Sequence, residues 1–240
     1  MTNSSMGDVK AVLLVGGLGT RLRSVVASKP KALAAIGEES FLELLVRQLR
    51  SQGIRNLVMC TGYLAEQIES QFGDGRSRDV SIEYSREETP LGTAGAIKLA
   101  ERYLRDAPEF LALNGDSFLA LNFSDLLSSH CEHGDAVATL AVLPVEDASR
   151  YGTVEVDAGG RVTGFAEKTG KLAPGLVNGG IYVFSQAIWR FIPEGAASLE
   201  KDVFPRLLEH GLYAREVRGM FIDIGTPGDY TRAQELLRFS

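Results

Sequence analysis

The segment that most constrains this chain is residues 10–31, KAVLLVGGLGTRLRSVVASKPK, in which an apolar run ends in a cluster of glycines. The run from Val12 to Val15 predicts a buried strand, because a short apolar run bounded by glycine is typical of a strand covered on both faces. Gly16, Gly17 and Gly19 then allow the backbone to turn and to approach a ligand closely. A loop of this kind between a strand and a helix offers main-chain N–H groups to an anion, so the sequence predicts a phosphate-binding loop.

The two best-known glycine-rich patterns do not fit this loop. A dinucleotide fingerprint G-x-G-x-x-G that starts at Gly17 needs glycine at position 22, which is Leu22. The fingerprint also needs an acid at the end of the second strand, where residues 61–63 read T-G-Y. A Walker loop needs Gly-Lys-Ser/Thr, whereas residues 19–21 read G-T-R. The loop therefore belongs to another kind of phosphate-binding site.

Strand and helix patterns alternate through the first half of the chain. Strands are expected at residues 54–60, 80–84 and 110–113, and helices at 41–52, 63–72 and 93–104. This alternation is typical of a parallel sheet that is covered by helices on both faces.

The second half of the chain is richer in strand patterns. Strands are expected at residues 136–145, 153–156, 162–166 and 176–184, the middle two forming a hairpin, and helices at 199–210 and 226–238. We predict an α/β fold with a Rossmann-like, mostly parallel (mixed) sheet flanked by helices, and a β-rich insertion that forms one wall of the site. Residues 10–240 are expected to form a single domain, and residues 1–9 a disordered N-terminal tail.

Composition and charge exclude several classes of protein. With 240 residues, 45% hydrophobic and 23% charged, the chain is typical of a globular protein with a sizeable core. The net charge of −6 argues against a nucleic-acid-binding surface, which is normally basic. No apolar run approaches the length of a membrane span, and the N-terminus lacks the layout of a signal peptide. We therefore expect a cytoplasmic protein that binds neither nucleic acid nor a membrane.

The cysteines and histidines offer one alternative site. Cys60 and Cys131 stand in dissimilar contexts, so the sequence predicts no disulfide framework. His130, Cys131 and His133 could suggest zinc, but a fourth ligand is not evident, and the remaining histidine is His210. We favour the interpretation of a helix C-terminus, where histidine interacts well with the negative end of the helix dipole.

Four segments carry a resemblance to a known family. They read G-G-L-G-T-R-L at 16–22 with P-K at 30–31, P-L-G-T-A-G-A at 90–96, N-G-D at 114–116, and F-I-D-I-G-T-P at 221–227. In this order they resemble the signature of the sugar-1-phosphate nucleotidylyltransferases, the enzymes that make NDP-sugars from an NTP and a sugar 1-phosphate. The resemblance implies a single nucleotidyltransferase domain over residues 10–240.

The resemblance implies that the glycine loop and the segment near residue 90 hold the nucleotide. The residues expected to do so are Leu14, Gly16, Gly17, Gly19, Thr20, Glu87, Gly92 and Thr93. We expect Thr93 to be the N-cap of the helix that starts there. Glu87 or Glu88 could accept hydrogen bonds from guanine N1–H and N2–H₂ together, a match that uracil lacks, and this favours GTP. Either acid could instead be solvated in a loop.

The resemblance also assigns the catalytic and metal-binding groups. Asp116 follows a buried strand, where open α/β sheets bind their ligands, and Asp223 lies in the last matching segment. These two aspartates are expected to hold Mg²⁺, which prefers carboxylate, phosphate and water oxygens. Arg21 would hold the departing phosphates and Lys31 would neutralise the α-phosphate. A sugar phosphate is mostly dianionic at neutral pH and needs no general base, so positioning and charge neutralisation would carry the catalysis.

The expected sugar-phosphate site comes from the second half of the chain. Its residues are Tyr151, Gly152, Glu167, Lys168, Asn178 and Gly179, in segments that resemble the family's Y-G, E-K and N-x-G. On the resemblance, Lys168 meets the sugar phosphate, while Glu167 and Asn178 bind sugar hydroxyls. Glu167 and Lys168 could instead form an exposed ion pair of little energetic weight.

The first segment, with T-R-L-R-S-V-V at 20–26, resembles the D-glycero-alpha-D-manno-heptose 1-phosphate guanylyltransferases in particular. Ala32 stands where the family commonly has a second proline, and G-E-E-S at 37–40 replaces the more usual G-x-P. Mannose 1-phosphate with GTP, and N-acetylmuramate or glucose 1-phosphate with UTP, stay open as substrates. A non-catalytic regulatory homologue that binds nucleotide sugars is an alternative from another class. A homodimer also stays open.

Overall fold

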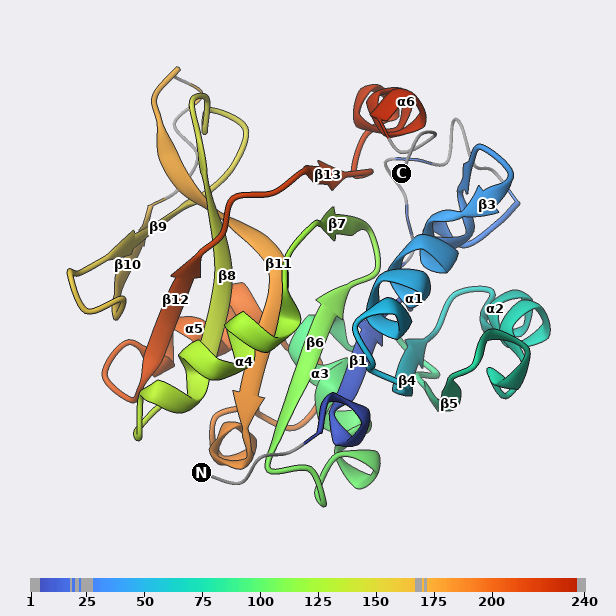
Figure 1. Ribbon diagram of the computed structural model, residues 1–240, viewed down its shortest axis with the longest axis horizontal. Coiled ribbons are helices and arrows are strands. Elements are labelled where there is room, and N and C mark those ends of the chain that lie inside the picture. Colours follow the sequence, from blue (N-terminus) through green and yellow to red (C-terminus); the bar gives the residue numbers. More distant parts are fainter. Residues whose placement is uncertain are drawn as a thin grey trace.

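The computed structural model describes residues 5–17, 19, 22, 28–166, 170 and 172–236. Within these residues, a nine-stranded sheet has the strand order β10-β9-β11-β6-β1-β4-β5, and β8 pairs with β11 and with β12 (Figure 1). The strands are β1 (Lys10–Leu14), β4 (Asn56–Thr61), β5 (Ser81–Arg86), β6 (Glu109–Asn114), β8 (Ala138–Val145), β9 (Thr153–Val156), β10 (Val162–Ala166), β11 (Gly175–Ser185) and β12 (Leu212–Glu216).

The sheet is mixed. Strands β6, β1, β4 and β5 run parallel to one another, whereas β11 runs antiparallel to β6 and β8. Strands β9 and β10 form the predicted hairpin and pair antiparallel at the edge of the sheet. Strand β12 runs parallel to β8. The predicted fold class, a mostly parallel but mixed sheet flanked by helices, is therefore confirmed.

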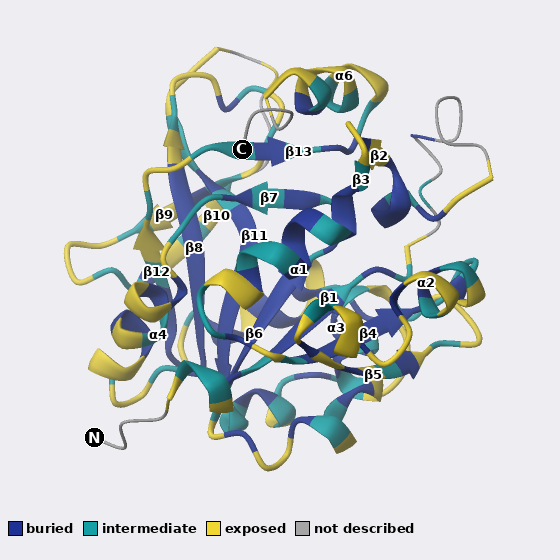
Figure 2. Cartoon of the chain, turned by 45° about the vertical axis from the view of Figure 1, so that its right-hand side comes forward, coloured by how far each residue is buried: buried dark blue, intermediate teal, exposed yellow. Residues whose placement is uncertain are grey.

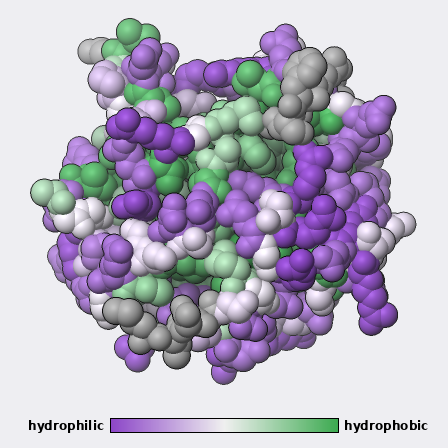
Figure 3. Space-filling view, viewed as in Figure 1, coloured by the Kyte–Doolittle hydropathy of each residue, from purple (hydrophilic) through white to green (hydrophobic). Residues whose placement is uncertain are grey.

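Helices cover both faces of the sheet. They are α1 (Phe41–Ser51), α2 (Ala65–Phe72) and α4 (Phe123–Glu132) on one face, and α3 (Gly92–Leu99) and α5 (Phe204–Leu207) on the other. Along β1, Ala11 and Leu13 belong to the first core while Val12 belongs to the second, because successive side chains of a strand point to opposite faces. Figure 2 shows the strands buried between helices whose outer sides are exposed. Figure 3 shows a mostly hydrophilic rim on one face, with apolar residues nearer the centre.

Two short sheets lie beside the large one in the described part of the chain. Strand β7 (Ser117–Leu119) pairs antiparallel with β13 (Phe221–Asp223), and β2 (Ala35–Ile36) pairs with β3 (Glu39–Ser40). Strand β7 follows β6 directly, and β13 precedes the last helix, α6 (Pro227–Leu236). The β7–β13 pair therefore brings the C-terminal segment of the chain beside the end of β6.

Two predicted helices are shorter than expected. The helix predicted at 93–104 ends at Leu99, and a 3-10 turn (η5, Glu101–Tyr103) follows it. The helix predicted at 199–210 consists of a π-helical turn (η7, Leu199–Val203) and α5. Pro205 lies at the junction, and because proline has no N–H it cannot continue the α-helical hydrogen bonds of the preceding turn.

The expectation of a disordered tail at 1–9 is wrong for its second half. Met6–Asp8 forms a 3-10 helix (η1), capped by the side chain of Ser5. Val9 is buried, and Asn56 Nδ2 donates a hydrogen bond of 2.7 Å to the carbonyl of Gly7. Residues 1–4 lie outside the described residues. None of the helices in the described ranges has the length and apolar character to cross a membrane.

The histidines of the alternative zinc site have different partners. His130 lies near the end of α4 with its ring buried, and its Nδ1 is 2.8 Å from Thr139 Oγ1. Burial, together with His133, lowers the pKa of His130 to about 4. The ring of His133 stacks on Tyr213 with 3.8 Å between centroids. The histidines are therefore explained by packing at the end of α4.

Candidate active site

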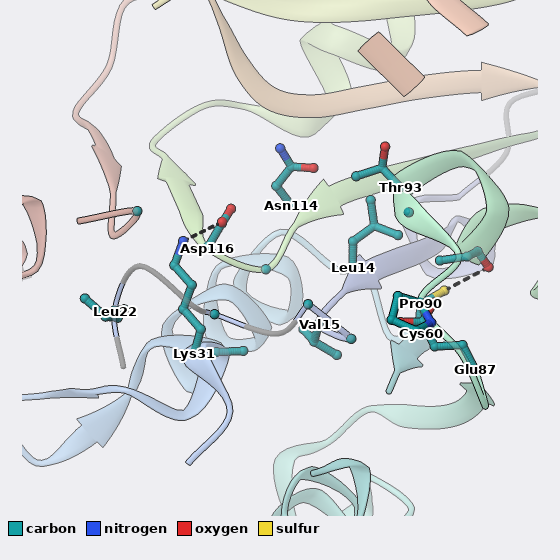
Figure 4. A pocket seen from close by; sticks show the side chains of 18 residues that line it. Leu14, Val15, Leu22, Lys31, Cys60, Glu87, Pro90, Thr93, Asn114 and Asp116 are labelled. Carbon is teal, nitrogen blue, oxygen red and sulfur yellow. Dashed lines mark hydrogen bonds and ion pairs between the residues drawn. The ribbon is translucent and has the colours of Figure 1, made fainter. Parts of the chain in front are cut away.

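A cavity of about 400 Å³ opens at the carboxyl ends of the parallel strands. The chain runs from β1 outward through β4 to β5 and returns as β6 on the other side of β1, so the strand order reverses between β1 and β6. Open α/β sheets bind ligands at such a reversal. Residues predicted for the nucleotide or for catalysis form much of the wall: Leu14, Gly16, Gly17, Gly19, Lys31, Glu87, Gly92, Thr93 and Asp116 (Figure 4).

The glycine loop forms one side of this cavity. A Cβ built on Gly16 would lie 2.9 Å from Glu87 Oε1 and 3.2 Å from the backbone of Thr61 and Gly62, so the loop packs closely against the end of β4. A Cβ built on Gly17 would meet nothing within 4 Å, which places this residue beside open space. The N–H of Tyr63 donates to the carbonyl of Gly16 at 3.3 Å and fixes the start of the loop. The loop is therefore tied down on one side and open on the other.

Lys31 and Asp116 meet at one end of the cavity. Lys31 Nζ lies 2.6 Å from Asp116 Oδ2, and the two side chains are 13% and 40% exposed (Figure 4). Lys31 begins a 3-10 turn (η3, Lys31–Leu33), while Asp116 lies in the turn between β6 and β7. The N–H of Gly115 donates to the carbonyl of Leu14 at 3.0 Å, and this holds the turn against β1. A cation and a carboxylate from distant segments are thus placed beside the glycine loop.

The pairing of β7 with β13 brings Asp223 to Asp116. Asp223 pairs with Ser117 in the ladder, and the N–H of Ile224 donates to the carbonyl of Asp116 at 2.9 Å. Burial raises the pKa of the Asp223 carboxyl, the nearby carboxylate of Asp116 raises it further, and Lys31 opposes both. The two predicted metal ligands therefore lie close enough to repel each other.

This donor set fits a divalent cation. Two nearby carboxylates whose mutual repulsion raises a pKa gain stability when a cation binds to both, and Lys31 already supplies positive charge to one oxygen of Asp116. The described residues contain no group of three or more His, Cys, Asp or Glu arranged to hold a metal. The further ligands of a cation on Asp116 and Asp223 would therefore come from substrate phosphate and water, as is usual for Mg²⁺.

Glu87 lies at the other end of the cavity. Its Oε2 accepts a hydrogen bond from the N–H of Leu91 at 3.0 Å, and burial raises the pKa of its carboxyl. Cys60 lies beside it, with Sγ 3.4 Å from the carbonyl of Ala96, and burial together with Glu87 raises the pKa of the thiol to about 12. Of the two acids proposed to recognise the base, Glu87 lines both this cavity and an adjoining surface hollow, whereas Glu88 lines the hollow and not the cavity.

The start of α3 closes the cavity on this side. Gly92 has φ +71°, and a Cβ there would lie 2.5 Å from the carbonyl of Ala197, so this position requires glycine. The prediction that Thr93 is the N-cap is wrong, because the cap position is Leu91 and has no side-chain hydrogen bond. Thr93 Oγ1 instead accepts a hydrogen bond from the N–H of Leu199 at 2.8 Å. The side chain of Thr93 therefore bonds to the distant segment η7 and does not cap its own helix.

Of the residues predicted for the sugar phosphate, Tyr151, Gly152, Asn178 and Gly179 belong to the described part of the chain. Tyr151 lines a second hollow of about 410 Å³ that Asp223 also lines. Asn178 Nδ2 donates to the hydroxyl of the buried Tyr182 at 2.9 Å. A Cβ on Gly179 would lie 2.6 Å from Leu119 Cδ2, which is a packing reason for glycine there. Within the described residues, Tyr151, Gly152, Asn178 and Gly179 do not line the cavity of Lys31 and Asp116.

Comparison with known proteins identifies the family. The sequence profile described as "Nucleotidyl transferase" matches residues 10–238, almost the whole chain. The chain belongs to the nucleotidyl transferase family. The resemblance found in the sequence is therefore confirmed.

Relatives within the nucleotidyl transferase family match the chain along most of its length. The chain is 39% identical to the D-glycero-alpha-D-manno-heptose 1-phosphate guanylyltransferase of Aneurinibacillus thermoaerophilus, covering 96% of this chain and 99% of that protein. It is 38% identical to the mannose-1-phosphate guanylyltransferase catalytic subunit beta of Danio rerio, covering 92% of this chain but spanning only 62% of that protein. The crystal structure of HddC from Yersinia pseudotuberculosis complexed with GMP-PN superposes with a TM-score of 0.85 at 32% identity, covering 96% of this chain and 100% of that one.

Four residues that the family resemblance singled out lie outside the described residues. They are Thr20, Arg21, Glu167 and Lys168. Their roles in the nucleotidyl transferase site stay predictions.

Asn114 is a cavity residue that sequence reasoning missed. It ends β6 and lines the cavity, and its side chain lies near the hydroxyl of Tyr182. Its Oδ1 is buried and has no hydrogen-bond partner within the described residues. A buried acceptor in a cavity wall is costly unless a ligand or water satisfies it. The sequence feature that could have identified Asn114 is its position at the end of a buried strand, two residues before Asp116.

Proposed function

We propose that this chain transfers a nucleotidyl group from GTP to a sugar 1-phosphate and releases pyrophosphate. The observation that carries the proposal is the convergence of Lys31, Asp116 and Asp223 beside a glycine loop that is open to the cavity. D-glycero-alpha-D-manno-heptose 1-phosphate is the sugar phosphate that we favour. A guanylyltransferase of that name matches this chain over 99% of its own length, which supports the choice.

In the proposed reaction, an oxygen of the sugar phosphate attacks the α-phosphorus of the nucleotide. The bond from this oxygen to phosphorus forms, the bond from the α-phosphorus to the bridging oxygen breaks, and pyrophosphate leaves with the electron pair. The attacking phosphate is mostly dianionic at neutral pH, so no general base has to remove a proton. The rate then depends on alignment and on neutralisation of the phosphate charges.

The residues of the chain divide this work by position. The glycine loop at Gly16 and Gly17 supplies backbone against the nucleotide phosphates, and Lys31 neutralises charge at the α-phosphate. Arg21 is proposed to hold the departing pyrophosphate. Tyr151, Gly152, Glu167, Lys168, Asn178 and Gly179 are proposed to bind the sugar phosphate. Gly92 and Thr93 are proposed to lie against the nucleoside.

Mg²⁺ is the cation that we propose for Asp116 and Asp223. When bound, it would supply positive charge to the phosphate oxygens of both substrates. The carboxylates that would hold it belong to β13 and to the β6–β7 turn, so its position is fixed by the pairing of β7 with β13.

Glu87 is the residue that we propose to recognise the nucleotide base. Its Oε2 is engaged by the N–H of Leu91, whereas Oε1 lies beside Gly16 and Gly62, at the base end of the cavity. One carboxylate oxygen held in place can orient the other toward the N–H groups of guanine. The names of the guanylyltransferase relatives, and the GMP-PN of the HddC complex, support GTP over UTP.

The test is pyrophosphate release with Mg²⁺ from GTP, UTP, CTP, ATP and dTTP, each against a panel of hexose and heptose 1-phosphates. We expect GTP with the heptose 1-phosphate to give the highest kcat/KM. Mannose 1-phosphate with GTP is the alternative that the second group of relatives favours. Use of UTP alone would contradict the role of Glu87. Binding of nucleotide sugar without pyrophosphate release from any pair would identify a regulatory homologue instead. We further propose that the product supplies surface polysaccharide synthesis. A cytoplasmic location and a homodimer stay predictions.

A further inference from the structure

Helix α6 contacts two segments that flank the catalytic groups on opposite sides. It begins four residues after Asp223, and in Figure 1 it lies beyond β13 at one end of the molecule. On one side, Asp229 at its first turn contacts Arg150. On the other, Tyr230 donates from its hydroxyl to the carbonyl of Ala35 at 2.6 Å. Because Ala35 lies four residues after Lys31, α6 connects the two walls of the site.

The contact with Arg150 is specific in its geometry. Arg150 Nη2 lies 2.7 Å from Asp229 Oδ2, and the same oxygen accepts a hydrogen bond of 2.6 Å from Thr226 Oγ1. Burial raises the pKa of Asp229, but the hydrogen bonds from Arg150 and Thr226 outweigh this effect and hold the pKa below its usual value. Asp229 is therefore ionised and fixed by two donors at neutral pH.

Arg150 immediately precedes Tyr151 and Gly152. The ring of Tyr151 packs edge-on against Phe221, with 6.3 Å between centroids, and Phe221 lies two residues before Asp223 on β13. Tyr151, Asp223 and Asp229 line the same hollow. The loop that carries Tyr151 is thus held at two adjacent residues, at Arg150 by Asp229 and at Tyr151 by Phe221 of β13.

We propose that Asp229 is a positioning residue, which through Arg150 holds the Tyr151–Gly152 loop at a fixed distance from Asp223. The proposal rests on the proposed function, in which this loop binds the sugar phosphate and Asp223 binds the cation. In this proposal Asp229 acts through Arg150 and not by contact with either substrate. Its role is to keep the sugar-phosphate loop correctly placed relative to the carboxylate of Asp223. A misplacement of the reacting groups by about 1 Å is enough to slow the reaction strongly.

At the Arg150–Asp229 pair, an effect on the stability of the protein can be distinguished from an effect on the position of the Tyr151–Gly152 loop. The side chain of Arg150 is 57% exposed, and ion pairs with an exposed member contribute little to the free energy of unfolding. Arg150→Ala also leaves the Thr226–Asp229 contact at the start of α6 in place. A change in kinetics without a change in Tm would therefore report on position.

The experiment compares Arg150→Ala, Arg150→Lys and Asp229→Asn with the control Glu235→Gln. Glu235 is an exposed acid on the same helix, so its substitution removes the same charge without touching the loop. For each variant, KM for the sugar 1-phosphate, KM for GTP, kcat and Tm are measured. Hydrogen–deuterium exchange of residues 147–156 is followed in the protein without substrates.

We expect Arg150→Ala and Asp229→Asn to raise KM for the sugar 1-phosphate by about tenfold, while KM for GTP changes by less than about twofold. Exchange at residues 147–156 should become faster, Arg150→Lys should recover part of the loss, and Glu235→Gln should match the wild type. The double variant Arg150→Ala/Asp229→Asn should be no worse than either single variant, because both remove one interaction.

Two failures are distinguishable. If the wild type releases no pyrophosphate with any substrate pair, the proposed function fails. If the wild type is active but Arg150→Ala keeps the wild-type KM for the sugar 1-phosphate and the wild-type exchange rates, the positioning role of Asp229 is wrong. An equal rise in both KM values with a lower Tm would also overturn it, because it would indicate a general loss of structure.

Discussion

At the scale of single residues, the site depends on one cation placed against two carboxylates. Lys31 pairs with Asp116 at 2.6 Å, and Asp116 in turn raises the pKa of Asp223. None of these contacts joins neighbours in the sequence. The residue types could be read from the sequence, but their distances depend on the β7–β13 pairing.

Lys31→Ala should lower kcat/KM by roughly 10²–10³-fold, because a charge that stabilises the transferring phosphate is lost in a partly buried site. Lys10→Ala is the matched control. Lys10 forms an ion pair with Asp106 at the same 2.6 Å, but at the start of β1, away from the cavity. Pyrophosphate release measures both variants, and equal losses in the two would refute the assigned role of Lys31.

Asp223→Asn should raise the stability of the metal-free protein while it abolishes activity. Burial and Asp116 raise the pKa of Asp223 in the folded state. Folding therefore favours the protonated carboxyl, so its contribution to stability is present below the pKa of the unfolded chain and lost as pH rises through the folded pKa. At pH 7 the variant should have the higher Tm, by about 2–4 °C for each kcal/mol gained.

The gain in Tm should shrink as the pH falls toward the ordinary pKa of aspartic acid. Thermal unfolding in EDTA across this pH range measures the difference. A variant that is less stable than the wild type at pH 7 would show that Asp223 is not strained by its neighbours.

At the scale of elements, the residues of the site lie at the ends of helices and strands. The sequence predicted that the glycine loop follows a buried strand, and in the structure this loop lies at the carboxyl ends of the parallel strands, where the cavity opens. This could be predicted because it depends on local apolar runs and glycine spacing. The N-cap prediction for Thr93 failed because the bond partner of its hydroxyl, Leu199, comes from η7. Asn114 was missed for a similar reason, since its importance depends on Tyr182 from β11. Contacts between distant segments carry no local sequence signal.

Gly92→Ala should destabilise the protein by about 1–3 kcal/mol and raise KM for the nucleotide, because φ is +71° and the added methyl would lie 2.5 Å from a carbonyl oxygen. Gly134→Ala is the control, since a Cβ there would meet nothing within 4 Å. Urea unfolding and nucleotide titration measure the two effects. Equal stability of the two variants would show that the start of α3 tolerates a shift.

At the scale of the whole molecule, the fold brings two halves of the chain to one edge of a mixed sheet. The parallel half provides the glycine loop, Lys31 and Asp116, and the last β-strand provides Asp223. Alternation of strand and helix patterns was enough to predict this architecture. It was not enough to place the Tyr151 loop, which lies along a second hollow because α6 and β13 hold it there.

In the proposed reaction, Asp116 and Asp223 hold one cation together with the nucleotide. Binding of Mn²⁺ in the presence of a non-hydrolysable GTP analogue tests it directly, by electron paramagnetic resonance on the wild type, Asp116→Ala, Asp223→Ala and the surface control Asp106→Ala. We predict one nucleotide-dependent site per chain, weakened by roughly 100-fold or more in either cavity variant and unchanged in the control. Undiminished Mn²⁺ binding in Asp223→Ala would contradict the account.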